Sequence, residues 1–221
     1  TGETMRGVYS FHARNFMSTE SPGEAVRKTD HGFVLWQPEG KEEPQDRGAF
    51  SAVIDDPETR VDCAWFRGGW YDALTMVWKS IKEGQAPEAD PPETGNPSPG
   101  GSLSVPFELQ PGETKVIRLR LAWHVPQTDL RLGKDADEGC CEDACACETG
   151  THQPWYAGVF PDVEAVNRYW GRHYDDLRDA SEAFSTCFYD TTLPPVVVEA
   201  IAANLTILKS PTVQRQTDGK L

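Results

Sequence analysis

Apolar and polar positions alternate most regularly on either side of residues 110–113, a Gln-Pro-Gly-Glu sequence. Val105, Phe107 and Leu109 precede it at every second position. Apolar residues recur after it at Val116, Ile117, Leu119, Leu121 and Trp123. Because a Pro-Gly turn between two alternating runs is a specific turn signal, this stretch predicts a β-hairpin.

The first hundred residues contain further strand signals in short segments rich in aromatic and β-branched residues. These segments, bounded by Gly, Pro, Asp or Asn, are 7–16, 32–39, 49–55 and 61–69. In 49–55 the apolar residues do not alternate strictly, although the composition still favours a strand. Together with the predicted hairpin, the four segments indicate a β-rich region over 1–126.

Two stretches interrupt this β-rich region. Residues 70–81 predict a short helix, because their apolar residues recur at helical spacing. Its apolar face consists of Leu74, Val77, Trp78 and Ile81. Residues 84–102 are dense in Pro and Gly and contain almost no apolar residues, which predicts an exposed loop.

After residue 154 the apolar spacing changes from two to three and four. Between residues 160 and 189 this spacing, with charged residues on the opposite face, predicts a long amphipathic helix bent near Gly171. A second helix is predicted to begin at Pro194 and Pro195 and to end at Ser210 and Pro211. Its apolar stripe consists of Val197, Ile201, Leu205 and Leu208.

These patterns divide the chain into four segments. We expect a β-rich domain over 1–126, an acidic cysteine-rich loop over 127–154, a linking helix over 155–190 and the start of a second domain over 191–221. Both ends of the sequence resemble cuts through a longer protein, so the expectation is parts of two domains rather than two complete ones.

Composition excludes several classes of partner. The 221 residues include 21 Lys and Arg against 35 Asp and Glu, a formal net charge of −14. Nucleic acids and anionic membranes bind basic surfaces, so neither is expected as the main partner. No run of about 18 apolar residues occurs, so no membrane-spanning helix is expected. No export signal is visible at the start, but a sequence that begins at a cut does not report the compartment of its parent; the location is left unassigned, with the cytoplasm favoured.

A cysteine cluster is the first candidate for chemistry. Cys140, Cys141, Cys145 and Cys147 fall within eight residues, and His152 follows. Four thiolates on one loop suit a soft metal, but their spacing differs from that of zinc fingers and ribbons. A metal site and a disulfide both remain open, while an unligated surface insertion is the favoured interpretation. No metal or cofactor is therefore assigned.

Histidines and carboxylates add no catalytic assignment. The five histidines show no H-x-H or H-x-x-x-H spacing. His124, beside the predicted strand, is expected to be packed or hydrogen-bonded rather than catalytic. The acidic pairs 55–56 and 175–176 are expected on solvated surfaces. Nucleophile-elbow, phosphate-loop and dinucleotide-binding motifs are absent, so the residues by themselves indicate an architecture and no reaction.

Three stretches together resemble glycoside hydrolase family 116, which includes the bile-acid β-glucosidases, or non-lysosomal glucosylceramidases. Residues 107–126 resemble the last hairpin of the family's N-terminal domain. Residues 155–170 are similar to its segment entering the inter-domain helix. Residues 188–221, with their L-P-P, N-L and S-P-T elements, resemble the start of its catalytic domain. The cysteine-rich insertion at 139–148 departs from the family pattern.

The resemblance implies a mixed fold, an antiparallel β-sandwich followed by helices that begin an (α/α)6 toroid. It also implies part of a retaining β-glucosidase that acts on β-glucosides such as glucosylceramide through two carboxylates. Neither carboxylate motif occurs in this sequence, so no residue is assigned a catalytic role. The chain alone is expected to be inactive, with the rest of its own catalytic domain as partner.

The alternative is a non-catalytic carbohydrate-binding or scaffolding β-sandwich module. In that interpretation, sugar rings would stack on exposed indoles. The candidate residues are Trp36, Trp65, Trp70 and Trp155.

Overall fold

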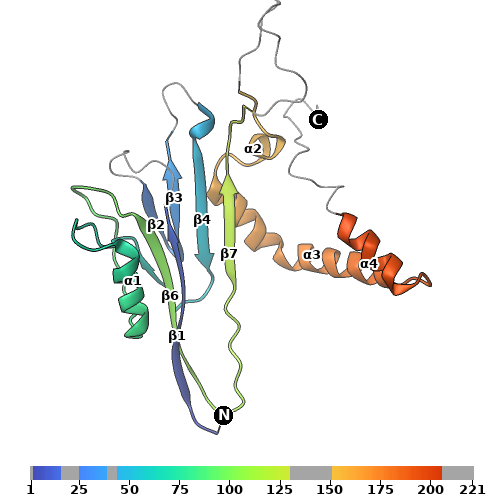
Figure 1. The fold of residues 1–221 in the computed structure, drawn as a ribbon, viewed down its shortest axis with the longest axis horizontal. Coiled ribbons are helices and arrows are strands. Elements are labelled where there is room, and N and C mark those ends of the chain that lie inside the picture. Colours follow the sequence, from blue (N-terminus) through green and yellow to red (C-terminus); the bar gives the residue numbers. More distant parts are fainter. Residues whose placement is uncertain (1, 16–24, 39–43, 130–150, 206–221) are drawn as a thin grey trace, which may run out of the picture.

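The strand segments form two antiparallel sheets in the computed structural model, which describes residues 2–15, 25–38, 44–129 and 151–205. The first sheet has the order β1 (Met5–Arg14), β6 (Gly100–Leu109), β5 (Arg60–Asp62). The second has the order β2 (Val26–Thr29), β3 (Gly32–Gln37), β4 (Gly48–Ile54), β7 (Leu119–His124). A 3-10 turn, η1 (Pro44–Asp46), precedes β4. The two sheets pack face to face, with β3 opposite β6 (Figure 1).

The sandwich core follows from the two-residue period of the strands. On β1 and β6, Phe11 and Leu103 face inward from paired positions, and on β3 Phe33 faces them. The Phe11 and Phe33 rings stack with their centroids 6.4 Å apart. The fully buried members of this core include Phe33, Ile54, Val61, Cys63, Leu103 and Val105. The predicted β-sandwich is therefore confirmed.

The predicted hairpin around residues 110–113 is wrong. The turn itself forms, with Gly112 at a φ of 82° and Glu113 N donating to Gln110 O. The runs on its two sides do not pair, because β6 lies between β1 and β5 in the first sheet whereas β7 pairs with β4 in the second. Both edges of β6 are thus occupied, and residues 110–118 carry the chain from one sheet to the other.

One helix lies outside the first sheet. The short helix predicted at 70–81 is confirmed as α1 (Ala73–Lys82). The predicted loop at 84–102 is right for most of its length, but its last residues form the buried start of β6. Gly100 and Gly101 fit there because a Cβ at Gly101 would lie 2.7 Å from the Phe33 ring.

Further helices follow β7. The predicted linking helix is two helices, α2 (Trp155–Val159) and α3 (Val163–Tyr189). The Asp162 carboxylate caps α3 by accepting from Ala165 N. The bend expected near Gly171 is confirmed by non-helical dihedral angles at His173 (φ −108°, ψ 15°). The second predicted helix is present as α4 (Pro195–Asn204), and its expected end at Ser210 and Pro211 lies outside the described residues.

We predict that Gly32→Ala destabilises the sandwich. A Cβ at Gly32 would overlap the backbone carbonyl oxygen of Ala52 on the paired strand, and backbone cannot move aside as a flexible side chain does. We expect a loss of about 2 kcal/mol in the free energy of unfolding, measured by urea denaturation.

Gly69→Ala is the matched control, because nothing lies within 4 Å of its added Cβ. It should change stability by less than about 0.5 kcal/mol. Equal losses in the two variants would contradict the steric explanation.

Candidate functional site

The outer face of the second sheet is the part of the molecule on which the helices are mounted. Val34, Ala122 and Val163 form a small buried cluster between this face and the start of α3. Trp36, Ala49 and Val166 extend the cluster as partly buried neighbours. Figure 1 shows α3 crossing beside β4 and β7 and then running away from the sheets.

Polar contacts fix the position of α2 and α3 on this face. Asn167 of α3 is buried and donates from Nδ2 to Ser51 Oγ of β4. His124, 5% exposed, hydrogen-bonds through Nε2 to Phe160 O at 2.8 Å. The expectation that His124 is packed and hydrogen-bonded is confirmed. At the surface, Arg27 pairs with Glu164 at 2.7 Å.

Tyr156 of α2 contacts the end of β7. Its hydroxyl donates to Val125 O and accepts from Val125 N, both at 2.8 Å. Its ring lies edge-on to His124, with centroids 5.8 Å apart. Burial raises the pKa of the Tyr156 phenol, so the group that makes both hydrogen bonds is neutral. Tyr156 therefore connects the sandwich to the start of the helical segment.

Gly171 allows the middle of α3 to lie against β7. A Cβ at this position would lie 2.8 Å from Arg120 Nη1. Arg120 of β7 in turn forms a bidentate ion pair with Asp55, in which Nη2 lies 2.8 Å from Oδ1. A larger residue at 171 would have to displace either the Arg120 guanidinium, and with it the ion pair, or the helix.

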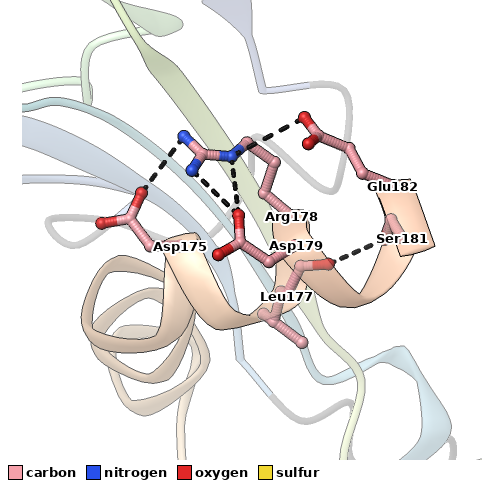
Figure 2. Close-up of polar contacts among 6 residues, drawn as sticks. All are labelled: Asp175, Leu177, Arg178, Asp179, Ser181 and Glu182. Carbon is pink, nitrogen blue, oxygen red and sulfur yellow. Dashed lines mark hydrogen bonds and ion pairs between the residues drawn. The ribbon is translucent and has the colours of Figure 1, made fainter.

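Beyond Gly171 the polar face of α3 is solvated and acidic. Figure 2 shows Arg178 surrounded by Asp175, Asp179 and Glu182, with its closest contact, 2.9 Å, to Asp179. The hydrogen bond and charge of Asp179 raise the pKa of the guanidinium. The expectation that Asp175 and Asp176 are solvated is confirmed, since their side chains are 78% and 87% exposed. Exposed pairs of this kind contribute little to stability.

The other faces of α3 and α4 expose apolar side chains. On the second half of α3 these residues are Leu177, Phe184 and Tyr189. On α4, Val196, Val197 and Ile201 are exposed and line an open apolar groove of about 670 Å³. α4 carries a single charged residue, Glu199. We call these six residues together the helical apolar surface: Leu177, Phe184, Tyr189, Val196, Val197 and Ile201.

The tryptophans suggested for sugar stacking occupy different environments. Trp65 is buried at 3% exposure, and Trp36 is partly buried beneath α3. Trp155 and Trp70 are 45% and 78% exposed, and Trp70 adjoins the exposed Tyr71 just before α1. The structure therefore does not bring the four together.

The cysteines divide between described and undescribed parts of the chain. Cys140, Cys141, Cys145 and Cys147 lie outside the described residues. Cys63 is buried, and burial raises the pKa of its thiol to about 12. Within the described ranges no group of three or more His, Cys, Asp or Glu could hold a metal ion, and no helix is long and apolar enough to cross a membrane.

Comparison with protein families identifies this arrangement. A family model described as beta-glucosidase 2, glycosyl-hydrolase family 116 N-term, matches residues 4–177. The chain belongs to glycoside hydrolase family 116. No curated protein matches it. The match covers both sheets, α1, α2 and the part of α3 that packs on the second sheet. The region that the family model describes therefore includes the contacts between α3 and the second sheet as well as the sandwich.

We predict that Tyr156→Phe loosens α2 from the sandwich. The change removes a hydroxyl that hydrogen-bonds both the N–H and the C=O of Val125. We therefore expect the free energy of unfolding to fall by about 1 kcal/mol. The difference from the unmodified chain should shrink above pH 10, because the unfolded phenol ionises near 10.0 while the folded pKa is raised. Thermal unfolding at a series of pH values measures both effects.

Tyr71→Phe serves as the control, since Tyr71 is 61% exposed and no hydrogen bond of its hydroxyl is found among the described residues. A loss as large in Tyr71→Phe would show that the Val125 contacts are not responsible.

Proposed function

We propose that this chain forms the N-terminal sandwich and linking helix of a retaining β-glucosidase that acts on β-glucosides such as glucosylceramide. In this proposal the two catalytic carboxylates belong to an (α/α)6 toroid that α4 begins. The observation that carries the proposal is the family 116 match over residues 4–177. The proposed reaction uses two carboxylates.

The helical apolar surface supports the proposal physically. A helix that is apolar nearly all round is stable in water only when other elements cover it. α4 fits that description, because Glu199 is its only charged residue and Val196 is 70% exposed. Further helices of a toroid would cover both α4 and the exposed apolar residues of α3. The proposed role of the sandwich is then to hold the first helices of the catalytic domain in a fixed position.

The rigid mounting of α3 fits this role. Its first turns are fixed to the second sheet by the Ser51–Asn167 contact, by Val163 and by the Arg27–Glu164 ion pair. Contacts at three positions in its first turns limit the rotation and sliding of the helix. A toroid that begins on such a helix has a defined orientation relative to the sandwich.

We predict that the gene encoding this chain yields a parent enzyme that hydrolyses 4-nitrophenyl β-D-glucoside with retention of configuration. Proton NMR of the first product should show β-glucose, and the 221-residue chain assayed alone should show no turnover above background. Turnover by the chain alone that depends on one of its own acidic residues would contradict the proposal, as would α-glucose as the first product.

We also predict that the double variant Val197→Asp, Ile201→Asp in that parent enzyme lowers the yield of active protein by about tenfold or more, because two charges would enter an apolar contact. Ala203→Asp is the matched control. It is exposed and lies on the α4 face marked by Glu199, about opposite the other two residues. Active-site titration with a covalent β-glucosidase inhibitor measures the yield. Equal yields would contradict the docking role of α4.

A carbohydrate-binding surface is the second candidate, and the exposed tryptophans at α1 favour it. Trp70 and Trp78 are 78% and 59% exposed, and pyranose C–H faces stack on such rings. Loss of oligosaccharide binding in a Trp70→Ala, Trp78→Ala variant would support this candidate, and a chain that binds no oligosaccharide would exclude it.

A further inference from the structure

A row of polar residues crosses the outer face of the first sheet. His12 of β1 pairs with Ser102 of β6, and Ser102 pairs with Asp62 of β5. Strands lie about 4.8 Å apart, so the row spans about 10 Å. Neighbouring residues in each strand face the sandwich core, as Phe11, Leu103 and Val61 do.

Helix α1 lies over this row and leaves a cavity of about 300 Å³ beneath it. Met76, Val77 and Ile81 of α1 form one wall, and Trp65 and Phe66 contribute to another. The volume is at the lower end of the range for small-molecule sites, ~300–1,000 Å³. We call this cavity the α1 pocket.

Hydrogen bonds fix the polar floor of the α1 pocket. Trp65 Nε1 donates to Ser102 Oγ at 2.7 Å, and His12 Nδ1 lies 2.8 Å from the same oxygen. Ser102 and Trp65 are 2% and 3% exposed, so this arrangement is buried and rigid. One nitrogen of the His12 ring is thereby occupied. The other, Nε2, is buried without a hydrogen-bond partner.

Asp62 presents the second polar group. One carboxylate oxygen, Oδ1, accepts from Ala64 N at 2.9 Å, which fixes the side chain beside the pocket. Burial raises the pKa of Asp62 and lowers that of His12. The charge of Asp62 partly offsets the lowering of the His12 pKa, and the charge of His12 partly offsets the raising of the Asp62 pKa.

The order of the three residues excludes a nucleophilic triad. In such a triad the imidazole lies between the hydroxyl and the carboxylate, so that it can take the proton of one while the other orients it. Here Ser102 lies in the middle of the row, and its oxygen already accepts from Trp65. The arrangement is therefore suited to binding rather than to acyl transfer.

We propose that the α1 pocket binds a neutral, polyhydroxylated small molecule of about monosaccharide size. One ligand hydroxyl donates to Asp62 and others reach Ser80 and Gln85, the further polar residues of the lining. The ligand's C–H surface packs against Met76, Val77 and Ile81 of α1.

Other ligand classes fit the pocket less well. An anion would meet the Asp62 carboxylate. A metal cation would find one carboxylate, with the charge of Lys28 nearby to oppose it. A wholly apolar ligand would cover the Asp62 carboxylate without offering it a hydrogen bond, which is costly. The α1 pocket lies within the sandwich and α1, so the proposal does not depend on a catalytic domain.

The test uses the whole chain and two probes, D-glucose and myo-inositol, followed by two-dimensional amide NMR. Saturable shifts should appear in α1 and around His12 and Asp62. Cyclohexanol, a ring of similar size with one hydroxyl, should cause none.

Two variants test the site itself. Asp62→Asn keeps the acceptor for Ala64 N and should weaken glucose binding about tenfold. Val77→Phe should remove it by filling the pocket from α1.

Asp72→Asn is the control for charge, since Asp72 is exposed, adjoins α1 and makes no side-chain cap. It should leave the affinity within about twofold, well below the tenfold effect of a lost charged hydrogen bond. Unchanged amide spectra away from the pocket verify folding of each variant. The proposal is overturned if neither probe gives saturable shifts, if cyclohexanol binds equally well, or if Asp62→Asn and Val77→Phe both bind like the unmodified chain.

Discussion

Burial of the second sheet on both faces is the constraint on which the rest of the structure depends. Phe33 and Leu35 of β3 face the sandwich core, while Val34 and Trp36 of the same strand face α3. A strand buried on both sides requires a continuous apolar run instead of alternation. The sequence Phe-Val-Leu-Trp at 33–36 satisfies that requirement. The sandwich and the linking helix therefore share one strand as their common core.

This shared strand explains the polar contacts above it. An apolar cluster as small as Val34, Ala122 and Val163 would allow α3 to slide, because burial is not directional. The Ser51–Asn167 contact and the hydrogen bond of His124 to Phe160 O are directional and buried. They select one position of the helix. Apolar packing holds α3 against the second sheet, and the two hydrogen bonds determine where along the sheet the helix lies.

Local sequence patterns predicted the local elements, whereas the long-range pairing was not predictable. Residues 70–81 and 160–189 carry helical spacing within their own length, and both helices formed with the bend near Gly171. The hairpin at 110–113 failed because the turn signal is local but the partners of β6 are β1 and β5, up to about a hundred residues away. His12 was missed as a site residue for the same reason. Its proximity to Asp62 exists only through two strand registers.

The two outer faces of the sandwich have separate roles in this arrangement. α3 packs on the outer face of the second sheet, and α1 lies over part of the outer face of the first (Figure 1). The whole sandwich core, including Phe33 and Leu103, lies between them. A domain docked on the helical apolar surface would therefore leave the α1 pocket uncovered. Conversely, a ligand beneath α1 would contact none of the residues that hold α3. The fold thus places the surface proposed for the attachment of further helices and the pocket proposed for a small molecule on opposite sides of the sandwich core.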